Sequence, residues 1–192
     1  QKHAPPRLCA NATYRRTLGT IFISVTMSNL NKFQRQIERR IKHASNQKRI
    51  HFGLEICKNQ LADYKNFETL FNWGNSQILI DAIKFIESYL ENSIQNIGDI
   101  ESLIEKVDSI IPDTEDFPSW EVSYALNASA SINELLMFIK DKDYRHILTI
   151  STLMIDTIDF KIQQEKDNIT YENIDNHSFL KKEIDYQLKL IK

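Results

Sequence analysis

An acidic loop is the first place in the sequence where chemistry can be expected. Asp113, Glu115 and Asp116 lie directly before a helix that Ser119 is predicted to cap. Carboxylate oxygens are the usual protein ligands of hard cations, but the loop lacks the acidic spacing of a calcium-binding loop. Acids just before a helix stabilise its N-terminus by roughly 0.3–1 kcal/mol each. We therefore interpret the loop as a helix cap and expect no bound metal.

Aromatic and amide side chains follow this loop on the predicted helix. Trp120 and Tyr124 lie one helical turn apart, with Phe117 and Asn127 close to them. Trp and Tyr are enriched at interfaces, so these four residues and the three acids form our candidate partner or pocket surface. The alternative is packing at the end of the core, which aromatic residues at helical spacing more often serve. The sequence favours the core interpretation.

The sequence carries no motif of the common enzyme classes. The five histidines are scattered, and no pair of His, Glu or Cys residues has the spacing of a zinc or di-iron site. A Gly-rich phosphate loop and a Gly-x-Ser-x-Gly turn are also missing from the sequence. We therefore assign no catalytic residue and no cofactor. The sequence favours a protein that is not an enzyme.

The formal net charge of −2 hides an uneven distribution along the chain. Residues 1–49 hold eleven Lys and Arg against one acid, whereas residues 50–192 hold thirteen against twenty-five acids. A basic helix face that lacks interleaved aromatic residues is formed by Lys32, Arg35, Arg39 and Lys42. Such a face could contact phosphate, but a solvated helix face is the favoured interpretation. We therefore do not expect a nucleic-acid partner.

Composition and periodicity predict an all-α fold. Apolar residues make up 42% of the chain, which suffices for a core, and only four Gly and four Pro interrupt it. No segment sustains the period of a strand, so we expect a single-domain bundle of about seven or eight helices without a sheet. This helical domain is predicted to span residues 27–192. We interpret residues 1–26 as a non-native or disordered N-terminal extension, with a targeting segment or a genuine arm as alternatives.

Apolar stripes and capping residues set the predicted helix boundaries. The first helix follows Ser28, and the second runs from about residue 45 to Leu61. Asp63 would cap a short third helix that ends at Gly74. The later helices are expected to start at Asn75 or Ser76, at Asp99, at Ser119 and at Asp143. Breaks are expected at Gly98, at Pro112 and over residues 165–176. A last helix is expected through Leu180 and Ile191.

The stretch Ile110–Ile139 is predicted to organise the bundle. Small residues occupy the middle of its helix, namely Ala125, Ala128, Ser129, Ala130 and Ser131. Small side chains let a neighbouring backbone approach closer than the usual ~8–10 Å between helix axes. We therefore expect this helix at the centre, with the other helices packed around it.

Two blocks of sequence resemble the YjaG-like bacterial family of helical domains. The first block contains Cys57, Tyr64, Phe67 and Trp73-Gly74, and the second contains Ile111-Pro112-Asp113, Asp116-Phe117, Trp120, Val122, Ala125-Leu126 and Ala128. Departures from the family pattern occur at Glu121, Tyr124 and Asn127, where the family usually has Gly, Pro and Asp. The resemblance spans about residues 52–160. It implies an all-helical, cytoplasmic bacterial protein and implies no activity.

A helical bundle without catalytic residues favours a non-catalytic protein-interaction or regulatory module. One alternative is an immunity-type toxin inhibitor, because an acidic surface speeds capture of a basic partner. Another is a small-ligand-binding protein or an enzyme with a pocket near Trp120 and Tyr124. We expect the partner to be another protein of unknown identity, with self-association as a further option.

Cysteine content and hydropathy predict the location. Cys9 and Cys57 do not form a disulfide framework, which suits a reducing compartment. The longest apolar candidate, Leu18 to Met27, is too short for a membrane span. A cytoplasmic location without membrane insertion is therefore expected.

Overall fold

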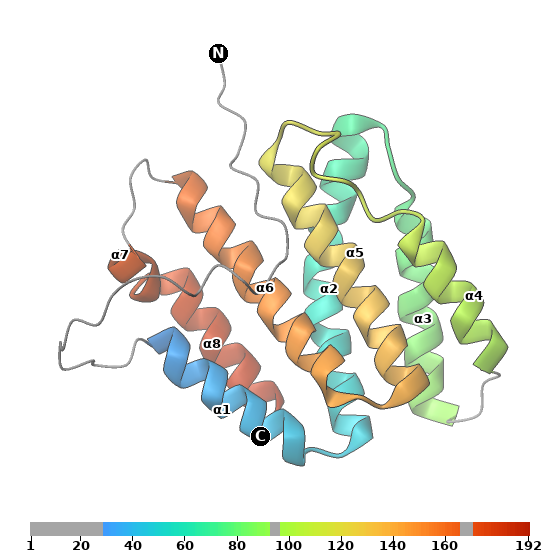
Figure 1. The fold of residues 1–192 in the computed structure, drawn as a ribbon, viewed down its shortest axis with the longest axis horizontal. Coiled ribbons are helices and arrows are strands. Elements are labelled where there is room, and N and C mark those ends of the chain that lie inside the picture. Colours follow the sequence, from blue (N-terminus) through green and yellow to red (C-terminus); the bar gives the residue numbers. More distant parts are fainter. Residues whose placement is uncertain (1–28, 93–96, 166–170) are drawn as a thin grey trace.

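Eight helices account for most of the chain that the structure describes. The structure is a computed structural model that describes residues 29–92, 97–165 and 171–192 (Figure 1). Its helices are α1 (Asn29–His43), α2 (Asn46–Phe71), α3 (Ser76–Asn92), α4 (Ile97–Asp108), α5 (Trp120–Asp141), α6 (Tyr144–Glu165), α7 (Tyr171–Asp175) and α8 (Ser178–Leu190). These ranges contain no strand, so the predicted all-α fold is confirmed. None of these helices is both long and apolar enough to cross a membrane. The predicted extension, residues 1–26, lies outside the described ranges.

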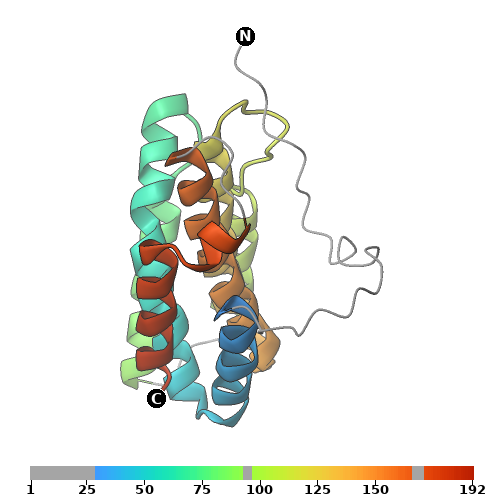
Figure 2. The ribbon, with the colours of Figure 1, turned by 90° about the vertical axis from the view of Figure 1, so that its left-hand side faces the viewer.

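The helix α5 lies in the middle of the bundle, beside α2 (Figure 1). It contacts α2, α3, α4 and α6. On one flank α1 and α8 pack against α6, as the turned view in Figure 2 shows, and on the other flank α3 packs against α4. Ala125, Ala128 and Ser129 of α5 have no exposed surface. The predicted central position of this helix is therefore confirmed. Its small residues allow neighbouring helices to pack on several sides.

A single helix, α2, replaces the two helices predicted over residues 45–74. The prediction that Asp63 caps a new helix is wrong. Asp63 lies inside α2, where its carboxylate forms an ion pair with Lys161 Nζ of α6 at 2.8 Å. The predicted end at Gly74 lies close to the observed end of α2 at Phe71. Asn72 and Gly74 have positive φ angles of 48° and 96°, with which an α-helix cannot continue.

Capping side chains fix several of the other helix starts. Ser119 accepts a hydrogen bond from the Glu121 backbone at 3.2 Å, and Asp143 accepts one from the Arg145 backbone at 3.0 Å, so both predicted caps are confirmed. The predicted cap at Asp99 is wrong, because α4 begins before it and leaves it in the first turn. The short helix α7 falls inside the predicted polar break, which the sequence pattern does not indicate.

Side chains from other helices hold both ends of α1. The Asp175 carboxylate of α7 accepts hydrogen bonds from the backbone N–H groups of Asn29 at 2.8 Å and Leu30 at 2.9 Å. At the opposite end, Arg49 Nε of α2 donates to the Ile41 carbonyl at 2.8 Å. These contacts satisfy backbone groups that a helix leaves unpaired at its ends. They join the start of α1 to α7 and its end to α2.

Candidate functional site

The predicted acidic loop forms a turn ahead of α5. Asp113 Oδ1 accepts a hydrogen bond from the Glu115 N–H at 2.9 Å, and the Asp113 carbonyl accepts one from the Asp116 N–H at 3.2 Å. All three acids are exposed. Within the described ranges, no group of three or more His, Cys, Asp or Glu residues is placed to hold a metal ion. The turn orders the chain before α5, and contact with a partner stays a prediction.

Phe117 belongs to an aromatic cluster that joins this loop to the end of α2. Its ring packs edge-on, at centroid distances of 5.0, 5.2 and 5.4 Å, against Phe67, Phe71 and Trp73. Edge-on aromatic contacts add roughly 0.5–1.5 kcal/mol to the burial of the rings. The side chain of Phe117 therefore serves packing in the described structure.

Trp120 and Tyr124 face α6. The Trp120 ring lies 5.9 Å from the Phe160 ring, and Lys161 Nζ lies 5.3 Å from the centre of the Tyr124 ring. The Tyr124 hydroxyl is buried and has no hydrogen-bond partner among the described residues. Burial, together with smaller contributions from nearby carboxylates, raises the pKa of Tyr124. The hydroxyl is therefore neutral at physiological pH.

Asn127 takes part in a buried polar cross-link between α2, α5 and α6. Its amide donates to Thr157 Oγ1 at 3.0 Å and to the Leu153 carbonyl at 3.2 Å. Gln60 Nε2 of α2 reaches the same Thr157 hydroxyl at 3.5 Å. Gln60 and Thr157 have no exposed surface, so these bonds form in a low-dielectric interior where each is stronger than in water. The cross-link fixes how the three helices align.

The structure therefore distributes the predicted site residues over a turn, an aromatic cluster and the interface between α5 and α6. Their role as a partner or pocket surface stays a prediction. The predicted basic face lies on α1, and its four members are exposed, namely Lys32, Arg35, Arg39 and Lys42.

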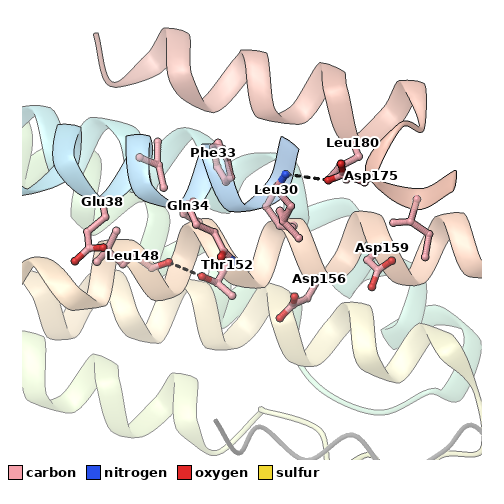
Figure 3. A pocket seen from close by; sticks show the side chains of 14 residues that line it. Leu30, Phe33, Gln34, Glu38, Leu148, Thr152, Asp156, Asp159, Asp175 and Leu180 are labelled. Carbon is pink, nitrogen blue, oxygen red and sulfur yellow. Dashed lines mark hydrogen bonds between the residues drawn. The ribbon is translucent and has the colours of Figure 1, made fainter. Parts of the chain in front are cut away.

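A groove of about 540 Å³ lies between α1 and α6, and α7 and α8 contribute to its lining (Figure 3). Its apolar walls include Phe33 and Ile37 of α1, Leu148 and Ile155 of α6, and Leu180 of α8. Small-molecule sites in proteins have volumes of about 300–1,000 Å³ and mostly apolar linings. The groove has the size and the lining of such a site.

Acidic side chains interrupt this apolar lining. The four acids are Glu38, Asp156, Asp159 and Asp175, and among the described residues no Lys, Arg or His lines the groove. Figure 3 shows the three aspartates toward the end where Leu30 lies, with Glu38 toward the other end. A concave site lined by charges of one sign concentrates ligands of the opposite sign. The charged side chains that line the groove in the described part of the chain are all acidic.

Asp159 is the acid of this set with an unsatisfied buried oxygen. Its Oδ2 accepts a hydrogen bond from Gln163 Nε2 at 3.1 Å, whereas its Oδ1 is buried and accepts none within the described structure. Burial raises the pKa of Asp159, against a smaller opposing contribution from the Gln163 hydrogen bond. Asp175 differs, because both of its oxygens accept backbone N–H groups of α1.

The two hydroxyl groups in the groove serve helix packing. Ser151 Oγ donates to Gln187 Oε1 of α8 at 2.5 Å, and Thr152 Oγ1 donates to the Leu148 carbonyl at 3.0 Å. A nucleophilic hydroxyl needs a base within hydrogen-bond reach, and an amide oxygen or a backbone carbonyl is not such a base. Both hydroxyls therefore donate to acceptors that join or stabilise helices.

Sequence reasoning missed this groove because its walls are far apart in the chain. The α1 wall precedes residue 44, whereas the α6 wall begins after residue 143. The available signal was Asp156 and Asp159, which lie three residues apart at the border of the apolar stripe of α6. Acids at such a border ordinarily face solvent, so they do not indicate a site by themselves.

Residues 36–192 match a family of proteins of unknown function, DUF416. The chain belongs to the DUF416 family. A crystal structure of a DUF416 family protein from Shewanella baltica OS155 is similar, with a TM-score of 0.71, 23% identity and coverage of 80% of each chain. At this identity the likeness shows a shared fold. No curated protein matches the chain.

The DUF416 match covers most of the groove. It includes the lining residues of α6, α7 and α8, together with Ile37 and Glu38 of α1. Three lining residues precede the match, namely Leu30, Phe33 and Gln34. One wall of the groove therefore extends beyond the part of the chain that the DUF416 match covers.

The two sequence blocks quoted above lie inside the DUF416 match and touch one another in space. The Tyr64 hydroxyl of the first block donates to the Ile110 carbonyl, which precedes the second block, at 2.8 Å. Trp73 of the first block packs against Phe117 of the second. These contacts give the motif residues a structural role, since they hold the loop before α5 against the end of α2.

Proposed function

We propose that this DUF416 protein is a non-catalytic regulatory or interaction module that binds its partner molecule in the groove between α1 and α6. The observation that carries the proposal is the combination of a ligand-sized volume, apolar walls and acidic side chains in one groove. The hydrogen bonds of Ser151 and Thr152 support the non-catalytic part, because both hydroxyls serve helix packing.

The source and the cellular location that we propose follow from the resemblance of the two sequence blocks. Their likeness to the YjaG-like family supports a bacterial, cytoplasmic protein. The groove replaces the surface near Trp120 and Tyr124 as the place where we expect binding, because the Trp120 ring packs on Phe160 and the Tyr124 ring lies beneath Lys161.

A matched pair of variants on α6 tests the groove as the binding site. Thr152 lines the groove, whereas Thr149 does not, although both are exposed and both donate to the carbonyl four residues earlier. Thr152→Trp should fill the groove, and Thr149→Trp should leave it open. Both variants should keep the fold, since neither side chain is buried, and far-ultraviolet circular dichroism checks this.

Extract from the source cells is first separated by dialysis into a dialysable fraction of small molecules and a retained fraction of macromolecules. Each protein is then mixed with each fraction, and its amide NMR spectrum is recorded. We expect one of the two fractions to shift resonances of α1 and α6 in the wild type and in Thr149→Trp, but not in Thr152→Trp. A dialysable component indicates a small ligand, and a retained one indicates a protein partner. Shifts that persist unchanged in Thr152→Trp, or chemical turnover of the bound component, would contradict the proposal.

An immunity-type inhibitor is the second candidate function. Residues 50–192 hold twenty-five acids against thirteen Lys and Arg, which favours capture of a basic protein over a wide surface. Such binding should weaken steeply with added salt and should survive Thr152→Trp. Those two results together would replace the groove proposal.

A further inference from the structure

The flank of the bundle formed by α1 and α8 is basic, and Figure 2 looks onto these two helices. The exposed acids of the two helices are Glu38 and Asp185. Against them α8 exposes three lysines, and α1 exposes a row of four bases, namely Lys32, Arg35, Arg39 and Lys42. Among the described residues, none of these four side chains has an ion-pair partner. We call this surface the basic flank.

The flank formed by α3 and α4 lies on the opposite side of the bundle and is acidic (Figure 1). Its exposed bases are Lys84 and Lys106. Glu101 of α4 is paired with Lys140 of α5 at 2.8 Å. The other exposed acids of the two helices are Asp81, Glu91, Asp99, Glu105 and Asp108. We call this surface the acidic flank.

The stretches outside the described ranges do not even out this separation of charge. Residues 1–28, which precede α1, hold four Lys and Arg and no acid. Residues 93–96, which join α3 to α4, hold no charged residue, and residues 166–170 hold one Lys and one Asp. The opposite signs of the two flanks are therefore a property of the whole chain.

Two copies of the chain have complementary charges where the basic flank of one faces the acidic flank of the other. A single exposed ion pair contributes little to stability, but a set of charges of one sign attracts an opposite set jointly. The formal net charge is only −2, so repulsion between whole copies is weak. The chain therefore supplies the surface that covers each of its own flanks.

We propose that the protein associates with itself head to tail, with the basic flank of one copy against the acidic flank of the next. Such a contact joins two different surfaces, so it extends into rows of copies unless the rotation between them closes a ring. This inference does not depend on ligand binding in the groove between α1 and α6. Thr152→Trp should therefore leave the association unchanged.

Sedimentation velocity of the full chain tests the association at protein concentrations up to about 1 mM, which detects a contact with a Kd of about 1 mM. The mean sedimentation coefficient should rise with concentration at about 0.01 M salt, where the Debye length is about 30 Å. It should return to the monomer value at about 1 M salt, where that length is about 3 Å. A chain that stays monomeric at low salt, or an association that persists at high salt, would overturn the proposal.

Two charge reversals locate the contact. Arg39→Glu on the basic flank and Glu105→Lys on the acidic flank should each weaken self-association at least about tenfold, because like charges then face one another. Lys65→Glu reverses an exposed charge on α2, which belongs to neither flank, and it should leave the association unchanged. All three side chains are exposed, and circular dichroism checks that the variants are folded.

A mixture of the two variants separates this pairing from a general effect of charge. The acidic flank of Arg39→Glu and the basic flank of Glu105→Lys are both intact, so the mixture should associate more strongly than either variant alone. Glu105→Lys raises the formal net charge from −2 to zero, so net charge does not attract it to the other variant. A mixture as weakly associated as its components, or reversals without effect, would refute the contact between the two flanks.

Discussion

The hydroxyl group of Tyr64 links α2 to two later segments of the chain. It donates to the Ile110 carbonyl at 2.8 Å, and the Asn75 N–H approaches it at 3.5 Å. Burial raises the pKa of Tyr64 to about 12, with the Asn75 N–H lowering it and the charge of Glu68 adding to the rise. The Tyr64 hydroxyl therefore stays a donor at neutral pH. Gly74, which has no side chain, leaves room for this hydroxyl.

Gly74→Ala is expected to lower the free energy of unfolding by roughly 1–3 kcal/mol, because a non-glycine residue at φ +96° is strained. A Cβ at this position would also lie 2.5 Å from Tyr64 Oη. In a Tyr64→Phe background that contact disappears and the strain remains, so Gly74→Ala should cost less there. Urea denaturation of the four proteins in this double-mutant cycle measures the coupling. Strictly additive effects would show that the two residues act separately.

His146 supplies a pH-dependent contact at the turn between α5 and α6. Its Nδ1 lies 2.5 Å from Glu134 Oε2, and its Nε2 lies 3.1 Å from Asp141 Oδ2. Burial lowers the pKa of His146, but the hydrogen bonds and charges of both carboxylates outweigh it and raise the pKa above 6.5. A raised folded pKa adds stability below the unfolded pKa and loses it as the pH rises through the folded value.

His146→Gln should therefore destabilise the protein more at about pH 5.5 than at about pH 8.5, since only the imidazolium attracts both carboxylates. Urea denaturation of the wild type and the variant at the two pH values measures the difference. His43→Gln is the control, because the exposed His43 ring forms its hydrogen bond with the Arg39 carbonyl rather than with a carboxylate. A larger effect of His146→Gln at the higher pH would refute the assignment.

At the scale of elements, α5 depends on small side chains where its neighbours approach. Ala128 has no exposed surface, so Ala128→Leu should overpack the core and cost roughly 1–3 kcal/mol. Ala62→Leu on the exposed side of α2 is the control and should be close to neutral. Thermal melts compare the two variants. Equal melting temperatures would mean that α5 has room that the described packing does not show.

The helices also show why local signals predict some boundaries and miss others. Ser119 and Asp143 cap helices because each side chain bonds a backbone N–H two residues later, which depends on local sequence. Asp63 has the same capping chemistry, yet its carboxylate forms an ion pair with Lys161, ninety-eight residues away. A sequence window contains no information about that partner, so the continuous α2 could not be predicted from it.

At the scale of the whole molecule, α1 joins the bundle through a cap supplied from α7. Asp175 and the first N–H groups of α1 lie 145 and 146 residues apart in the chain. Asp175→Ala should cost roughly 0.5–2 kcal/mol locally, the usual range for a lost cap. Without this cap the first turn of α1 should open more often. Since α1 forms one wall of the groove, that wall should become less ordered at this end.

Hydrogen–deuterium exchange of the first turn of α1 measures this effect. Exchange there should speed up in Asp175→Ala while the centre of α5 stays protected, since opening of a helix end is local. Asp185→Ala removes an exposed acid of α8 and should leave the exchange of α1 unchanged. Unchanged exchange of α1 in Asp175→Ala would show that the side-chain packing of α1 on α6 and α8 is enough to hold it.

The sequence by itself determined the helical class, most helix starts and the central place of α5. These features depend on residues within a few turns of each other, such as the apolar period and the run of small residues from Ala125 to Ser131. Only the tertiary structure decided which acids share a groove, because Glu38 and Asp159 belong to helices that meet after folding. An exposed acid on an isolated helix and an acid in an apolar groove have the same local sequence pattern, and the neighbouring helix makes the difference.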